Sequence, residues 1–140
     1  MGQALLLTGR PGVGKTTIIR TVATRLGATA GGFYTEEIRE RGRRTGFRLV
    51  SLDGATGILA SVNIASAYRV GKYRVHLRDL EQVGVEALLR AVQQPGVSVV
   101  VIDEIGKMEL FCGPFKDVVL SAVGGPGRVL ATVMAKPNPW

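Results

Sequence analysis

Two stretches of the sequence hold residues whose types and spacing suit phosphate chemistry. In the first, residues 9–16 match the pattern G-x-x-x-x-G-K-S/T without a mismatch, and such a loop between a strand and a helix is typical of nucleotide binding. Glycines let backbone N–H groups point inward around phosphate oxygens, and the following helix adds its own N-terminal N–H groups. We expect Lys15 to reach the β- and γ-phosphates and the Thr16 hydroxyl to bind Mg²⁺. The predicted nucleotide-binding residues are Gly9, Arg10, Pro11, Gly12, Val13, Gly14, Lys15, Thr16 and Thr17.

The second stretch places two carboxylates after an apolar, β-branched run. Residues 97–102 predict a strand covered on both faces, and Asp103 and Glu104 follow at its carboxyl end, where open α/β sheets bind ligands. We expect Asp103 to face the Mg²⁺ through a metal-bound water and Glu104 to orient or deprotonate an attacking water. The alternative is an ordinary acidic loop. Glu104 and Lys15 are the predicted catalytic residues, and Thr16 and Asp103 are the predicted metal ligands.

Other charged side chains give weaker signals. Lys107 lies three residues after Glu104 and is a candidate to face the nucleotide. His76, the sole histidine, is on the polar side of an alternating segment, which predicts a surface position. A solvated turn and a phosphate-contacting surface are both compatible with a cluster of arginines in one short stretch. That cluster comprises Arg39, Arg41, Arg43, Arg44 and Arg48.

Strands alternating with helices are needed to position these residues. Asp79 and Gln82 resemble a capping box that opens one helix. Residues 40–46 predict a hairpin connection, and residues 63–71 predict a loop. Strands are predicted at 5–7 (buried), 33–39, 47–52, 58–62, 72–77, 97–102 and 129–133, and helices at 18–26, 80–91 and 115–122.

Length and composition limit the class of protein. A chain of 140 residues with 46% hydrophobic residues predicts one domain, residues 1–140. Its apolar runs are shorter than the roughly 18 residues of a membrane span, so we expect no membrane association. A single cysteine favours a reducing cytoplasm. The net charge of +7 fits attraction to a polyphosphate; nucleic acid is also compatible but not favoured, because no aromatic-interleaved RNA-binding signature accompanies it.

The motifs together resemble those of a family of small cytoplasmic nucleoside-triphosphatases found from thermophilic bacteria and archaea to vertebrates. The first motif, residues 9–17, is shared by many ATPases, whereas the runs at residues 32–37 and 102–110 are more specific. The resemblance rests on Gly9-Arg10-Pro11-Gly12-Val13-Gly14-Lys15-Thr16-Thr17, Gly32-Phe33-Tyr34-Thr35-Glu36-Glu37-Ile38-Arg39, Gly42-Arg43-Arg44-Thr45-Gly46-Phe47 and Ile102-Asp103-Glu104-Ile105-Gly106-Lys107-Met108-Glu109-Leu110.

This resemblance implies a three-layer, RecA-like α/β fold with a mainly parallel central sheet and a β-hairpin insertion. It also implies slow, Mg²⁺-dependent hydrolysis of several nucleoside triphosphates to diphosphate and phosphate. Glu36, Arg43, Arg44 and Lys107 become candidate substrate contacts. Most such enzymes need an arginine that stabilises charge on the γ-phosphate, and Arg43 and Arg44 are the candidates.

One departure from the family concerns the C-terminus. Family members continue for several tens of residues beyond the strand at 129–133, with a further helix and strand, so we expect an incomplete domain. We expect a monomer, with association through an uncovered edge at that last strand as the alternative. Two other functions stay open: a small nucleotide or nucleoside kinase, and a nucleotide-switched module that binds RNA or protein.

Overall fold

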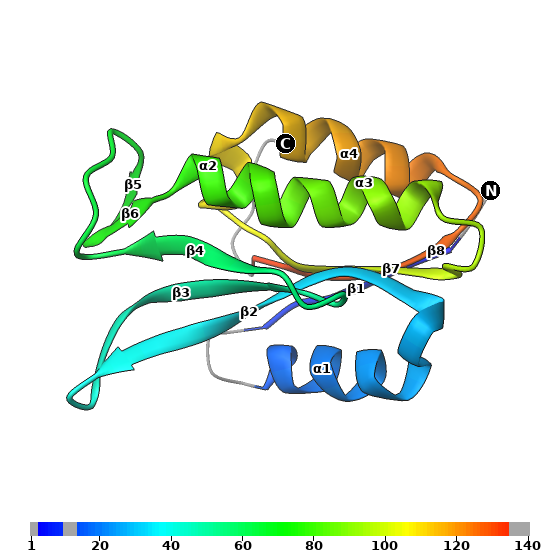
Figure 1. Cartoon of the computed structure of the whole chain (residues 1–140), viewed down its shortest axis with the longest axis horizontal. Coiled ribbons are helices and arrows are strands. Elements are labelled where there is room, and N and C mark those ends of the chain that lie inside the picture. Colours follow the sequence, from blue (N-terminus) through cyan, green and yellow to red (C-terminus); the bar gives the residue numbers. More distant parts are fainter. Residues whose placement is uncertain (1–2, 10–13, 135–140) are drawn as a thin grey trace.

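Three layers form around one β-sheet in the computed structural model, which describes residues 3–9 and 14–134 (Figure 1). Helix α1 (Lys15–Leu26) covers one face of the sheet. Helices α3 (Glu86–Gln93) and α4 (Gly113–Gly124) cover the other face. The predicted three-layer α/β fold is therefore confirmed. None of the helices in the described ranges combines the length and apolar character needed to cross a membrane.

The sheet is mixed, with a parallel half and an antiparallel half. Its order is β1-β8-β7-β2-β3-β4-β6-β5. The pairings from β1 to β2 are parallel, and those from β2 to β5 are antiparallel. The expected hairpin insertion thus extends the same sheet, which is not mainly parallel. The strands are β1 (Ala4–Leu7), β2 (Ala30–Glu40), β3 (Arg43–Ser51), β4 (Thr56–Ser61), β5 (Arg69–Val70), β6 (Tyr73–Val75), β7 (Val99–Ile105) and β8 (Arg128–Val133).

Strand β7 lies in the centre of the core and is covered on both faces, as its sequence predicts. Val101 packs with Ile19 of α1 on one face. Val100 and Ile102 belong to the larger cluster on the opposite face, which also contains Phe115 of α4. Burying each such side chain contributes about 1.5–3 kcal/mol. This packing holds the carboxyl end of β7, with Asp103 and Glu104, at a fixed place between the layers.

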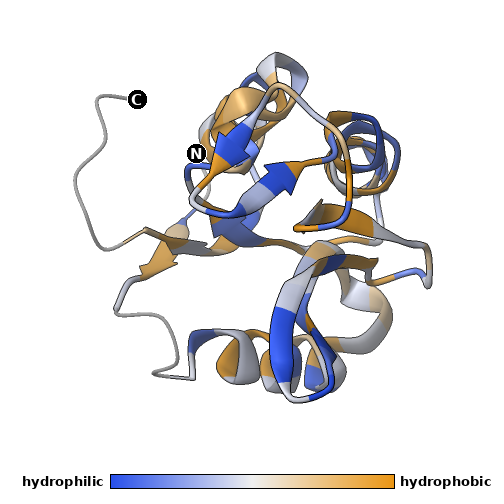
Figure 2. Cartoon of the chain, turned by 90° about the vertical axis from the view of Figure 1, so that its left-hand side faces the viewer, coloured by the Kyte–Doolittle hydropathy of each residue, from blue (hydrophilic) through white to orange (hydrophobic). Residues whose placement is uncertain are grey.

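Strands β2 and β3 are joined by a turn of two residues, Arg41 and Gly42. Both have positive φ, 53° and 78°, which is the conformation of a type I′ hairpin turn. The predicted connection at 40–46 is too long, because Arg43 and Arg44 already pair with β2. Arg44 is therefore a strand residue, held in register across the sheet. The ends of this hairpin and of the β5–β6 hairpin are largely hydrophilic (Figure 2).

The helical segment from residue 77 begins earlier than predicted and is not regular. It consists of a short α-helical turn, α2 (Leu77–Asp79), a π-helical stretch (Leu80–Val85) and α3. The capping-box prediction is wrong: the His76 Nδ1 caps the segment by accepting from the Asp79 N–H at 3.1 Å. The Asp79 carboxylate instead accepts from the Ile58 N–H at 2.8 Å. It thus ties β4 to this helical segment. A short strand, β5, also occurs where residues 63–71 predict only loop.

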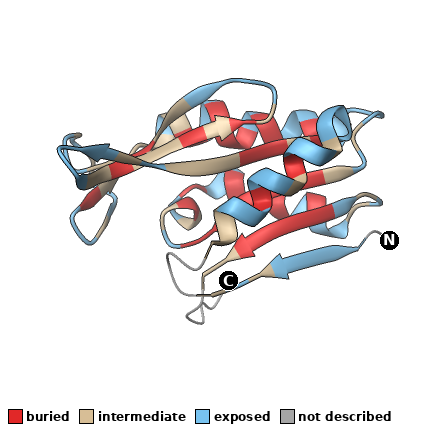
Figure 3. Ribbon diagram, turned by 90° about the horizontal axis from the view of Figure 1, so that it is seen from below, coloured by how far each residue is buried: buried red, intermediate tan, exposed pale blue. Residues whose placement is uncertain are grey.

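Among the described strands, β1 forms an edge of the sheet, with β8 as its neighbour (Figure 3). The predicted strand at 5–7 is confirmed as β1, but Leu5 and Leu6 are 61% and 52% exposed, so the prediction that this strand is buried is wrong. Strand β8 is not an edge strand, because β1 and β7 pair with its two sides. Its residues 129–132 are buried. The expectation of an uncovered edge at the last strand is therefore wrong.

Candidate active site

The start of α1 brings Lys15 and Thr16 to the carboxyl edge of the sheet. Gly14 precedes the helix with a φ of 98°, a left-handed conformation that glycine adopts without steric cost. The first residues of α1 line the pocket described below, and the N–H groups at a helix N-terminus favour an anion. Arg10, Pro11, Gly12 and Val13, predicted to complete the phosphate loop, lie outside the described residues.

Asp103 is held by hydrogen bonds from three neighbouring elements. The Thr16 hydroxyl of α1 donates to its Oδ2 at 3.0 Å, and the Thr35 N–H of β2 donates to the same oxygen at 3.3 Å. The Thr132 hydroxyl of β8 donates to Oδ1 at 2.6 Å. Asp103 is 2% exposed, so these donors replace the water that a carboxylate otherwise needs. The two predicted metal ligands therefore lie side by side, with the carboxylate in a fixed orientation.

Lys15 and Glu104 form an ion pair beside Asp103. The Lys15 Nζ lies 3.1 Å from Glu104 Oε2. The two side chains are 13% and 35% exposed, which leaves the carboxylate open to the pocket. The structure thus brings together both predicted catalytic residues and both predicted metal ligands.

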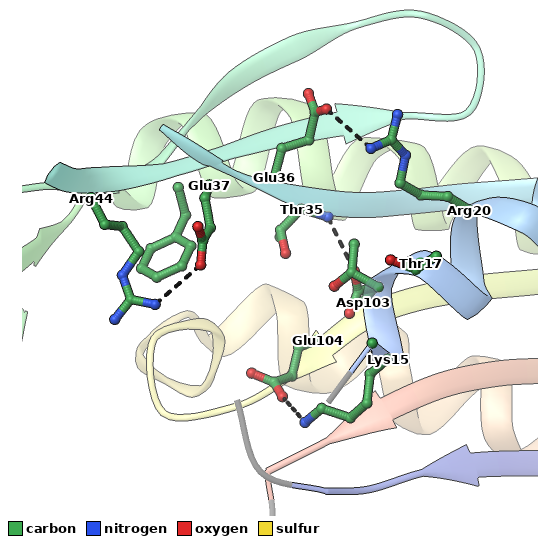
Figure 4. Close-up of a pocket in the computed structure, with 12 residues that line it drawn as sticks. Lys15, Thr17, Arg20, Thr35, Glu36, Glu37, Arg44, Asp103 and Glu104 are labelled. Atoms are coloured by element: carbon green, nitrogen blue, oxygen red, sulfur yellow. Dashed lines mark hydrogen bonds and ion pairs between the residues drawn. The ribbon is translucent and has the colours of Figure 1, made fainter. Parts of the chain in front are cut away.

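These four residues lie on one pocket of about 580 Å³, shown in Figure 4. The pocket extends from the start of α1, between the middle of β2 and the carboxyl end of β7, to Arg44 and Phe47 of β3. Its walls therefore combine residues predicted to bind phosphate and metal with charged side chains from the hairpin. The lining residues are Gly14, Lys15, Thr16, Thr17, Arg20, Thr35, Glu36, Glu37, Arg44, Phe47, Asp103 and Glu104.

Of the two candidate arginines, Arg44 lines this pocket, whereas Arg43 is exposed beside Glu40 and is not among the lining residues. The Arg44 Nη1 donates to Glu37 Oε1 at 3.2 Å. Arg44 therefore presents a cation to the pocket at the end away from α1 (Figure 4). Lys107 is exposed and likewise does not contribute to the lining.

Glu36 also lines the pocket, and it is paired with two arginines. Its carboxylate lies 3.6 Å from the Arg20 Nη1 and 3.9 Å from the Arg48 Nη1. Arg20 in turn lies over the ring of Tyr34, 5.2 Å from its centroid. Glu36 thus links α1 to the β2–β3 hairpin along one wall of the pocket.

Glu109 is a buried carboxyl group behind the site, and sequence reasoning gave it no role. It is 3% exposed, in a short helical turn (Glu109–Phe111) after β7. Burial, reinforced by the negative charges of Glu104 and Asp103, raises the pKa of this carboxyl to about 8, although backbone hydrogen bonds at Glu109 and Gly106 oppose the shift. A Cβ on Gly106 would lie 3.0 Å from a Glu104 oxygen and 3.2 Å from a Glu109 oxygen. The two carboxyl groups therefore flank this glycine.

Thr35 and Thr132 are the other residues that sequence reasoning missed. Thr35 stands within the specific run at residues 32–39, but its contribution is a backbone N–H, which carries no sequence signal. Thr132 is fully buried in β8, which is otherwise apolar from residue 129 to residue 133. A polar residue inside such a strand was the one available signal, because a buried hydroxyl needs a partner.

Comparison with known proteins gives consistent results. A family model described as NTPase matches residues 4–140. The nucleoside-triphosphatase THEP1 of Thermotoga sp. (strain RQ2) is 51% identical over 97% of this chain and 76% of that protein. The human cancer-related nucleoside-triphosphatase is 42% identical over 99% of this chain and 78% of its own length. Among solved structures, the crystal structure of THEP1 from Aquifex aeolicus matches 96% of this chain and 78% of that one, with a TM-score of 0.86 and 39% identity.

Proposed function

This chain belongs to the NTPase family and is a nucleoside-triphosphatase, and on that premise we propose how its residues carry out the hydrolysis. The observation that carries the proposal is the meeting of Lys15 and Glu104 with Thr16 and Asp103 on one pocket. Each of the four has the chemistry that breakage of a β–γ phosphoanhydride bond requires. The names of the relatives favour hydrolysis over the kinase and binding-module alternatives.

Lys15 and the N-terminus of α1 bind the triphosphate in this proposal. Lys15 is already at the pocket, where its Nζ pairs with Glu104. A bound γ-phosphate would share this ammonium with Glu104. The helix N-terminus adds N–H donors and a partial positive charge to the same anion.

Thr16 and Asp103 fit Mg²⁺, because a hydroxyl and a carboxylate oxygen 3.0 Å apart supply the hard oxygen ligands that this cation prefers. When bound, Mg²⁺ would neutralise part of the negative charge of the triphosphate. Thr35 and Thr132 keep the Asp103 carboxylate turned toward Thr16. One protein carboxylate is sufficient for such a site, since phosphate oxygens and water complete the coordination.

Glu104 is the proposed general base. Water attacks the γ-phosphorus, a new P–O bond forms, and the bond from γ-phosphorus to the bridging oxygen breaks, releasing nucleoside diphosphate. The proton of the attacking water passes to Glu104, whose carboxylate is partly open to the pocket. Lys15, in contact with that carboxylate, offsets the negative charge that gathers around the transferred group.

Arg44 is the proposed transition-state arginine. It lies on the pocket wall at the hairpin, on the far side of Glu104 from α1 (Figure 4). A guanidinium there can donate to γ-phosphoryl oxygens as their charge increases. The exposed positions of Arg43 and Lys107 support the choice of Arg44 over both.

All of these groups are proposed to contact phosphate, metal or water, and none is proposed to contact the nucleobase. We therefore propose that the enzyme accepts ATP, GTP, CTP and UTP. We also propose that it acts in the cytoplasm, where these substrates are made. The single cysteine, Cys112, is a buried free thiol, which suits a reducing compartment.

The test is phosphate release from each triphosphate, with and without Mg²⁺, by the wild type and by Glu104→Gln. The amide keeps the shape of the side chain but cannot accept the proton, so kcat should fall by about 10²–10⁴. Binding of a fluorescent nucleotide should persist, since Lys15 and Thr16 are unchanged. Glu40→Gln is the matched control, because Glu40 is exposed at the hairpin turn. A Glu104→Gln enzyme with wild-type kcat would refute the role of the base, and hydrolysis without Mg²⁺ would refute that of the metal.

A further inference from the structure

Tyr73 is a buried residue whose hydroxyl contacts the pocket-lining arginine, although it comes from a distant part of the sheet. It lies on β6, which is separated from β3 by β4. The Arg44 Nε donates to the Tyr73 hydroxyl oxygen at 2.8 Å. Tyr73 is 8% exposed. Arg44 therefore reaches across β4 for this contact, which the catalytic proposal does not use.

Aromatic rings enclose the same guanidinium. Its central carbon lies 5.2 Å from the ring centroid of Phe47 and 5.6 Å from that of Tyr73. The two rings pack edge to face, with centroids 5.2 Å apart. Contacts of a cation with two ring faces are favourable and depend on the orientation of the guanidinium. The corner formed by Phe47 and Tyr73 thus limits where the head of Arg44 can lie.

The N–H groups of Arg44 contact both this corner and the pocket: Nε donates to Tyr73, and Nη1 donates to Glu37. Guanidinium is planar, with its N–H groups in a rigid fork. A bond from Nε to Tyr73 therefore fixes the plane of the guanidinium and leaves the outward N–H groups of Nη1 and Nη2, at the end of the fork, available to the pocket. Of these, Nη1 donates to Glu37, which itself lines the pocket. The edge that meets Glu37 is the edge that could meet a phosphoryl oxygen.

We propose that Tyr73 is a positioning residue for catalysis: its hydroxyl holds Arg44 so that the Nη1 and Nη2 edge faces the γ-phosphoryl group. This inference rests on the transition-state role proposed above for Arg44. Tyr73 itself does not touch the nucleotide. It acts through the Nε–H bond, and its ring keeps Phe47 in place against the guanidinium.

Glu37 completes the arrangement by holding the same edge in the absence of nucleotide. It accepts from Arg44 Nη1 at 3.2 Å and from Arg39 Nε at 3.0 Å. When a phosphoryl oxygen replaces Glu37 as the acceptor at Arg44 Nη1, Arg39 still neutralises Glu37. The exchange therefore leaves no unpaired carboxylate. The Tyr73 bond lies on the other side of the guanidinium and is kept throughout.

The test is a double-mutant cycle with Tyr73→Phe and Arg44→Ala, measured as kcat and KM for ATP hydrolysis. Tyr73→Phe removes one oxygen and keeps the ring on Phe47. Losing a hydrogen bond from a charged donor should lower kcat about tenfold, with KM unchanged, because Arg44 acts in the transition state. Arg44→Ala should lower kcat on the order of a thousandfold. The double variant should be no slower than Arg44→Ala, since Tyr73 has nothing left to position.

Tyr68→Phe is the matched control, because Tyr68 is 43% exposed and packs its ring on Phe111, away from Arg44. It should retain wild-type kcat. If Tyr73→Phe leaves kcat unchanged, or slows the Arg44→Ala enzyme by the same factor as the wild type, the positioning role is refuted. If Arg44→Ala alone has wild-type kcat, the proposed role of Arg44 fails, and this inference fails with it.

Discussion

Replacing Glu109 by glutamine should remove a marked dependence of stability on pH. This carboxyl is 3% exposed, and burial raises its pKa to about 8 from an ordinary value of 4.5. The folded protein therefore binds a proton there that the unfolded chain releases between these two values. The stabilising contribution is fully present below the unfolded pKa and is lost as the pH rises through the folded pKa.

The size of this pH effect follows from the interval between the unfolded and folded pKa values of Glu109. Where the folded state is protonated and the unfolded state is not, the free energy of unfolding falls by about 1.4 kcal/mol per pH unit. Between pH 5.5 and 7.5 the wild type should therefore lose about 3 kcal/mol through Glu109. For a chain of this size, that corresponds to a decrease of about 10 °C in the melting temperature.

The assay is thermal unfolding at several pH values between 5.5 and 7.5, with wild type, Glu109→Gln and Glu40→Gln. Glutamine has the shape of a protonated glutamate and does not titrate, so Glu109→Gln should lose the slope and exceed the wild type in melting temperature at pH 7.5. Glu40→Gln, which removes an exposed carboxylate, should keep the wild-type slope. A wild type with a constant melting temperature over this range, or a Glu109→Gln variant with an unchanged slope, would show that the reasoning is wrong.

Two further predictions concern the core near the site. Thr132→Val should destabilise the fold by about 2 kcal/mol and weaken Mg²⁺ activation, because Asp103 loses the hydroxyl that donates to it at 2.6 Å. Thr132→Ser keeps the hydroxyl and should have wild-type stability in chemical denaturation and wild-type activation in an Mg²⁺ titration. A Thr132→Val protein equal to wild type in both assays would contradict this prediction. Gly32→Ala should destabilise by several kcal/mol more than Gly42→Ala in denaturant titrations: both glycines have positive φ, but only at Gly32 would a Cβ collide with the backbone of Val101. Equal losses of unfolding free energy in the two variants would contradict this prediction, because they would mean that β2 and β7 can move apart without destabilising the fold.

The meeting of Lys15, Thr16, Asp103 and Glu104 on one pocket could be predicted from sequence because each of its signals is local. Residues 9–16 specify a loop and the start of a helix, and the run at 97–102 specifies a buried strand followed by two carboxylates. Parallel strands carry their carboxyl ends to the same edge, so placing Lys15 near Glu104 required only the correct fold class. The 3.1 Å contact between them agrees with that reasoning.

Predictions failed where the answer depended on partners distant in the sequence. Leu5 and Leu6 are predicted to be buried, but β1 is an edge strand among the described residues, and no property of residues 5–7 indicates what lies beside them. Likewise, β8 is the last described strand in sequence order, but it is not an edge of the sheet, because β1 pairs with it from the other end of the chain. Strand order is a property of the whole sheet.

The sequence by itself determined the proposed chemistry: which loop is predicted to bind phosphate, which hydroxyl and carboxylate are predicted to hold a metal, and which carboxylate is predicted to accept a proton. It left Arg43 and Arg44 equivalent, since neighbouring arginines differ only in the side of the strand that each faces. Tertiary structure decided between them through the two-residue turn that sets the register of β3, and through Tyr73, which reaches Arg44 from β6. It also buried Glu109 behind the site, because desolvation depends on all surrounding atoms and not on sequence neighbours.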